Sequence, residues 1–178
     1  MKKLIWNLLA INLAALAGIS AFSCAYAAAP EGETYYTKAN IWYENAKPIK
    51  VNYHRGTMIL VGTEVKIDAF KRNEIKFTTS SGVTLVFQND PKYSTINLQK
   101  LFDRYFSKEN ILTARGGLYR KFSKKEKEHI KEGTIEEGMS KEAVLIAYGY
   151  PPSHRTTALT SDEWAYWDSR FSSFRVIF

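Results

Sequence analysis

Cysteine, histidine and proline are scarce in this chain of 178 residues, which holds one, three and five of them. A single cysteine excludes a disulfide framework and a cysteine-based zinc cluster within one chain. No two histidines are three or four residues apart, the spacing of a local metal site. The chain also lacks a Gly-x-Ser-x-Gly nucleophile motif and a phosphate-binding loop. We therefore expect a protein that is not an enzyme and holds no metal or cofactor.

One histidine keeps a catalytic alternative open. His54 stands beside Arg55 at a turn between two expected strands, where it could serve as the general base of a periplasmic hydrolase. The structural interpretation, a turn histidine held by a hydrogen bond, is favoured.

The first 27 residues have the pattern of an export signal. Lys2 and Lys3 precede an uncharged run over residues 4–22, and a small-x-small triplet ends at Ala27. One alternative is a retained membrane anchor, because about 19 apolar residues are just enough to span a bilayer. Another is lipidation at Cys24. We expect cleavage after Ala27 and an exported protein, attached to a membrane if it is lipidated.

Residues 28–110 are expected to form a β-rich module. Short apolar runs separated by glycine and proline predict strands over residues 41–43, 51–53, 58–61, 64–67, 74–77 and 83–87. The turn from Thr79 to Gly82 has the composition of a hairpin. Several short strands indicate a small barrel or curled sheet. Over residues 95–109 the apolar period becomes helical, which predicts an amphipathic helix covering the sheet.

Two further helices are expected after this module. Residues 111–132 are predicted to be a basic helical linker, in which Ser123 and Glu126 form a capping box for a helix over residues 124–132. Residues 133–178 begin a second module with a helix that starts at Ser140. Gly149 is suited to its carboxyl end, and Pro151 forbids its continuation.

The chain closes with two alternating strands, over residues 163–167 and 174–178, which predict a hairpin. Trp164 and Tyr166 share one face of the first strand. That face is either core or a surface on which a sugar ring could stack.

Two resemblances follow from these motifs. The segments Gly138 to Leu145, Tyr148 to Pro151 and Trp164 to Trp167 resemble the SmpA/OmlA family, also called BamE, over residues 134–178. Residues 62–67 resemble the strand entry of bacterial SH3-like modules.

The BamE resemblance implies an α+β fold of two helices packed on an antiparallel hairpin. The residues that the resemblance implies as determinants of this fold are Gly138, Met139, Ser140, Gly149 and Pro151. It also implies a non-enzymatic role in outer-membrane assembly or envelope integrity. The resemblance thus implies a periplasmic protein of a Gram-negative bacterium, associated with the outer membrane if it is lipidated.

Positive charge is concentrated in one segment. Removing Lys2 and Lys3 with the signal lowers the net charge from +7 to +5, and residues 95–132 hold ten basic and five acidic residues. The candidate contacts are Arg120, Lys121, Lys124, Lys125, Lys127 and Lys131, together with His154 and Arg155 in a later loop. A solvated helix with pairs such as Lys124 to Glu128 is the plainer interpretation.

An exported protein without a recognition motif is not expected to bind nucleic acid. Anionic lipid headgroups or an envelope protein partner are the expected targets of the basic segment. The sequence thus predicts an exported binding or assembly factor of the envelope. Its rival is a peptidoglycan-binding module.

Overall fold

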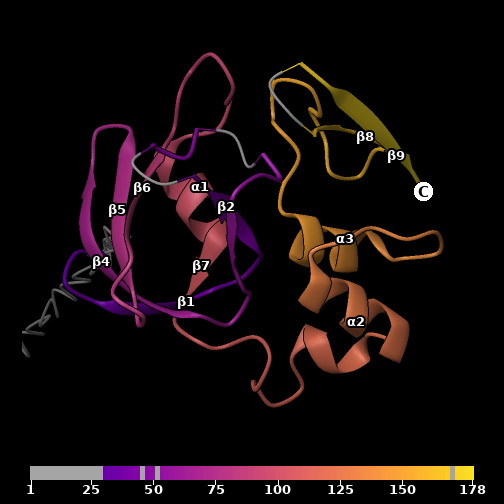
Figure 1. The fold of residues 1–178 in the computed structure, drawn as a ribbon, viewed down its shortest axis with the longest axis horizontal. Helices are drawn as coiled ribbons and strands as arrows, with labels where there is room; N and C mark the ends of the chain where they lie inside the picture. The colour runs from indigo at the N-terminus through magenta and orange to yellow at the C-terminus, as the bar shows by residue number, and fades with distance from the viewer. Residues whose placement is uncertain (1–29, 45–46, 51–52, 169–170) are drawn as a thin grey trace, which may run out of the picture.

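The computed structural model of the protein describes residues 30–44, 47–50, 53–168 and 171–178, and Figure 1 shows how their elements are arranged. The strands are β1 (Thr34–Thr37), β2 (Ile41–Tyr43), β3 (Thr57–Ile59), β4 (Glu64–Lys71), β5 (Glu74–Thr79), β6 (Thr84–Gln88), β7 (Phe106–Ser107), β8 (Glu163–Trp167) and β9 (Ser173–Ile177). The helices are α1 (Leu98–Tyr105), the 3-10 helix η1 (Leu118–Lys121), α2 (Lys124–Glu132) and α3 (Lys141–Tyr148). The protein is therefore a mixed α+β fold.

An antiparallel sheet in the order β6-β5-β4-β1-β7 forms the N-terminal part. Burial alternates along its long strands, so that Val65 and Ile67 of β4 face the core while Lys66 faces solvent. The expected hairpin is confirmed, with Gly82 in the left-handed region at φ 85° between β5 and β6. The sheet therefore has one buried and one solvated face.

Helix α1 covers the buried face, as the apolar period predicts, but it is shorter than residues 95–109. The Asn97 side chain caps its amino end, and the helix stops at Tyr105. Phe106, expected on the helix, instead pairs with Thr37 in β7. The Phe106 amide still donates to the Phe102 carbonyl, but the neighbouring Tyr105 carbonyl accepts from the Lys38 amide next to β1. Pairing with β1 therefore outweighs the local helical pattern.

The expected barrel is not formed by the described residues. Strands β2 and β3 pair with each other rather than with the large sheet, which remains open. At the outer edge of β6, the described residues form only an isolated parallel bridge, between Ile49 and Phe87. The strand expected over residues 51–53 lies partly outside the described residues.

Helices α2 and α3 and the hairpin β8–β9 form the C-terminal part, with a core of their own (Figure 1). Ile130 of α2, Val144 of α3 and Trp164 of β8 are all fully buried there. Val61 from the N-terminal part packs into the same core. The charged helix α2 is thus attached to the fold by its one apolar face.

Within the described residues, no helix is both long and apolar enough to cross a membrane. Cys24, Ala27 and the expected signal lie outside the described residues.

Candidate functional site

The amino ends of α2 and α3 meet at one carboxylate. Glu126 accepts hydrogen bonds from the amide and hydroxyl of Ser123, the N-cap of α2, at 2.9 and 3.0 Å. Its other oxygen accepts from the amide and hydroxyl of Ser140, the N-cap of α3, at 3.1 and 2.7 Å. Burial raises the pKa of Glu126, but these four hydrogen bonds outweigh it and lower the pKa to about 2. The predicted capping box is confirmed, and its carboxylate holds a second helix as well.

Asn40 joins the opposite ends of the same helices. Its buried amide donates to the carbonyls of Ile130 in α2 and Ala147 in α3, at 2.7 and 2.9 Å. Its oxygen accepts from the amide of Val61 at 2.8 Å. Because one side chain serves both amino ends and another serves both carboxyl ends, α2 and α3 lie side by side and point the same way. Their dipoles add at the amino ends, where the charge of Glu126 offsets them.

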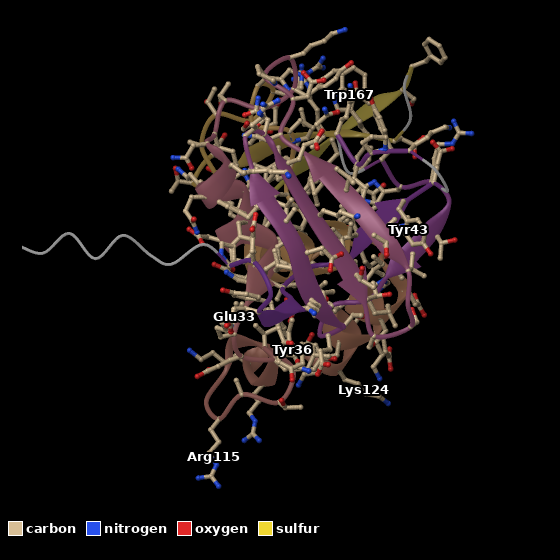
Figure 2. The ribbon with its side chains drawn as sticks, turned by 90° about the vertical axis from the view of Figure 1, so that its left-hand side faces the viewer. Glu33, Tyr36, Tyr43, Arg115, Lys124 and Trp167 are labelled. Atoms are coloured by element: carbon tan, nitrogen blue, oxygen red, sulfur yellow. The ribbon has the colours of Figure 1, made fainter. Side chains whose placement is uncertain are left out.

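The basic surface lies on α2, on η1 and on the loop before η1. We define it as the side chains of Arg115, Arg120, Lys121, Lys124, Lys125, Lys127 and Lys131. All except Lys127 are exposed. Figure 2 shows that the side chains of Arg115 and Lys124 project at the same end of the molecule. Charge is therefore directed to solvent at the end where α2 lies.

Few of these cations have a partner among the described residues. Lys125 lies 3.9 Å from a carboxylate oxygen of Glu136, and the ammonium of Lys127 lies 5.6 Å from the centre of the Tyr119 ring. The i,i+4 ion pair expected between Lys124 and Glu128 is not formed within 4.0 Å. Most of these cations therefore form no ion pair among the described residues, while Glu126, Glu128 and Glu132 of α2 lower the net charge of residues 111–132 to +4, seven basic residues against three acidic.

An exposed apolar side chain lies beside the basic surface in sequence. Leu118 opens η1 directly after Gly116 and Gly117 and is 42% exposed. An apolar side chain among cations is the composition of surfaces that bind at membrane interfaces. Sequence reasoning missed Leu118, because its only signal is the pair of glycines before it.

His54 is packed among rings rather than placed beside a nucleophile. Its Nε2 lies 2.8 Å from the carbonyl of Tyr148, to which it donates, and its ring stacks on that tyrosine and meets Trp42 edge-on. Burial lowers the pKa of His54 to about 4, against smaller opposing effects of the Tyr148 and Trp167 carbonyls. The ring is therefore neutral at physiological pH, and its role is to join the loop before β3 to the end of α3.

His154 and Arg155 are also occupied. Nδ1 of His154 lies 2.8 Å from the carbonyl of Tyr93, which ties the loop after α3 to the segment before α1. The guanidinium of Arg155 lies 5.0 Å from the centre of the Trp167 ring. These contacts favour a structural role for both residues.

Trp164 and Tyr166 do not form a ligand face. Their side chains are 0% and 2% exposed, and the Tyr166 hydroxyl donates to the carbonyl of Gly149 at 2.9 Å. The hairpin must cover α3 with one face, and this is the face that it uses. Trp167, on the opposite face, is only half-buried.

The expected fold determinants lie at the ends of α3. Ser140 is its N-cap, and Met139 beside it is buried. Gly149 ends it at φ 81°, followed by the buried Pro151. Gly138 adopts φ 84° with open space around it, so its backbone conformation alone favours glycine there.

Within the part of the chain that the structure describes, no three His, Cys, Asp or Glu side chains gather to hold a metal ion. Comparison with family models, curated proteins and solved structures finds no match for this chain. Its function must therefore be inferred from its own residues.

Proposed function

We propose that this chain is an exported, non-enzymatic envelope protein that binds anionic lipid headgroups through the basic surface. The observation that carries the proposal is a group of seven cations, exposed except for Lys127, next in sequence to the exposed Leu118; among the described residues only Lys125 of this group forms an ion pair. Phosphate-bearing headgroups supply the missing negative charge, and Leu118 can enter the apolar boundary below them.

The charge on this surface is enough for reversible attachment. Each lysine or arginine near an anionic membrane contributes about 1 kcal/mol, and the effect falls off within about 8 Å at physiological ionic strength. If roughly four of the cations reach the membrane together, the sum is about 4 kcal/mol, a dissociation constant of about 1 mM. Such binding orients the protein at a membrane without anchoring it.

Sedimentation with vesicles tests the proposal. The chain beginning at Ala28 should sediment with vesicles that contain phosphatidylglycerol and not with phosphatidylcholine alone, and high salt should release it. Replacing Lys124, Lys125 and Lys131 together by glutamine should abolish sedimentation.

A matched control removes the same charge elsewhere. Lys66, Lys71 and Lys76 are exposed on β4 and β5, and their joint replacement by glutamine should leave binding intact. Equal loss in both triple variants would show a net-charge effect and contradict the assignment of the surface. No binding to either vesicle would point to an acidic protein partner instead.

We further propose that residues 133–178 form a BamE-like module and residues 28–110 an SH3-like module. The basic segment between them, residues 111–132, packs on the first of these modules through Ile130 of α2. The order of α3, β8 and β9 supports the first resemblance, and the small antiparallel sheet supports the second. A supporting role in outer-membrane assembly follows from the first resemblance.

Peptidoglycan binding is the second candidate function. A pocket of about 150 Å³ has Trp42, Tyr43, Tyr53 and Arg55 among its lining residues, a composition that suits stacking on sugars. Figure 2 shows Tyr43 in the N-terminal part of the molecule, away from Arg115. Strong sedimentation with purified sacculi, lost on changing Tyr43 to alanine, would favour this function over lipid binding.

A further inference from the structure

Exposed apolar side chains gather at the C-terminal hairpin. The described part of the chain has five large hydrophobic side chains that are exposed, and three follow β8: Phe171 (90%), Ile177 (78%) and Phe178 (37%). Ile177 belongs to β9, and Phe178 directly follows it. Water is therefore in contact with apolar surface at both ends of β9.

The backbone of β9 has an open edge. The Phe178 amide donates to Asp162 and the Asp168 amide donates to Ser172, which fixes the pairs that exchange hydrogen bonds across the hairpin. In an antiparallel ladder such pairs alternate with pairs whose backbone groups point outward. The outward groups of β9 are therefore those of Ser173, Arg175 and Ile177, and no described strand pairs with them.

The outer edge of β8 is covered, in contrast. The Ala165 amide donates to the hydroxyl of Thr156 at 3.0 Å, and the Glu163 amide donates to the hydroxyl of Ser161 at 3.3 Å. Folded proteins cover or disrupt such edges because they recruit further strands. Only one edge of this hairpin is protected by the described residues.

A groove runs beside the open edge. It has a volume of about 830 Å³ and lies between β9, the α2–α3 loop and the first turns of α3. Its apolar lining comes from Ile135, Met139 and Val144 on one side and from Phe174 and Val176 of β9 on the other. A strand added to β9 would direct every second side chain toward these residues.

A second copy of this chain fits the groove poorly. If β9 paired with β9 of a second copy, the side chains that had to enter the groove would include Phe174 of that copy. Phe174 already packs on Tyr148 and Tyr166 of its own chain. Pairing centred on Arg175 would also place two arginines opposite each other, which is unfavourable.

We propose that β9 and this groove bind an extended segment of another protein, added as a third antiparallel or parallel strand. Apolar side chains of the segment alternate with polar ones and enter the groove. A carboxylate on its solvent face lies opposite Arg175, whose guanidinium is exposed and bonds to Glu163 at 2.7 Å. The three residues of β9 with outward backbone groups span five positions of the strand, so the bound segment should be about five residues long.

Labelled peptides test this proposal in the whole protein. A peptide of alternating valine and polar residues with a central glutamate should bind, as measured by fluorescence anisotropy. The same composition with its valines in one block should bind at least tenfold more weakly, and so should the peptide with lysine in place of glutamate.

Position 177 provides a matched pair of variants. Ile177→Pro removes the outward amide without touching the bonds to β8, whereas Ile177→Ala removes the side chain and keeps the amide. We expect the proline variant to bind the peptide at least tenfold more weakly than the alanine variant. Circular dichroism confirms that both are folded.

Amide hydrogen exchange gives a readout that does not depend on variants. On peptide binding, exchange should slow at Arg175 and Ile177 and stay unchanged at Phe174 and Val176. Equal binding of the proline and alanine variants, equal binding of the blocked peptide, or a peptide-free dimer through β9 would each overturn the proposal.

Discussion

Changing Asn40 to alanine should remove two of the hydrogen bonds that join the two parts of the fold and one within the N-terminal part. The truncation leaves the carbonyls of Ile130 and Ala147 and the amide of Val61 without the partner that each has in the native protein. A buried polar group left unpaired costs about 1–3 kcal/mol, so three such groups could cost about 3–9 kcal/mol. Because single substitutions rarely cost more than about 5 kcal/mol, we predict a loss of about 3–5 kcal/mol. That is a large part of the 5–15 kcal/mol that is typical of a domain.

Urea denaturation followed by circular dichroism measures this loss as a lower midpoint. Because two of the three bonds end on helices, exchange of amide hydrogens should accelerate more in α2 and α3 than in β4 and β5. Asn73→Ala, in the exposed turn between β4 and β5, is the control and should change stability by less than about 0.5 kcal/mol. A loss below about 1 kcal/mol for Asn40→Ala, or uniform acceleration of exchange, would refute the reasoning.

Three further outcomes follow from the structure. Glu126→Gln should cost about 1–2 kcal/mol in thermal unfolding at pH 7. Because the folded pKa of Glu126 is lowered to about 2, this difference should disappear as pH falls from 4.5 through 2. Because the folded pKa of His54 is lowered to about 4, the free energy of unfolding should fall by up to about 3 kcal/mol as pH falls from 6.5 through 4. The same dependence of stability on pH in His54→Gln would contradict this. Gly133→Ala would place a Cβ 2.6 Å from the Trp42 ring at φ 70°, so it should lose about 2–3 kcal/mol; Gly138→Ala, with open space, should lose about 1 kcal/mol. Equal midpoints for the two glycine variants would exclude a steric cause.

The helix boundaries of the C-terminal part could be predicted from the sequence, because they depend on residues close along the chain. Ser123 and Ser140 cap the amides of residues three positions later, and Gly149 takes the positive φ at which α3 ends. The alternation of β4, β5 and β6 was equally local, since a strand with one buried face repeats every two residues.

The candidate site was harder to predict from the sequence, because it depends on which side chains the fold leaves exposed. Charge counting identified the lysines of α2, but which of them find a carboxylate is decided by side chains from other elements. Trp164 and Tyr166 illustrate the same limit, because alternation shows that they share a face and cannot show which face is buried.

Sequence alone determined where the capped helices begin and that the last strands form a hairpin, since these features rest on hydrogen bonds between residues close along the chain. Only the tertiary structure decided that Phe106 leaves α1 for β7 and that Asn40 joins both helices. It also decided that the edge of β9 stays open among the described residues while that of β8 is covered. These outcomes depend on groups far apart in the chain competing for the same partners, and that competition is settled only when the chain is folded.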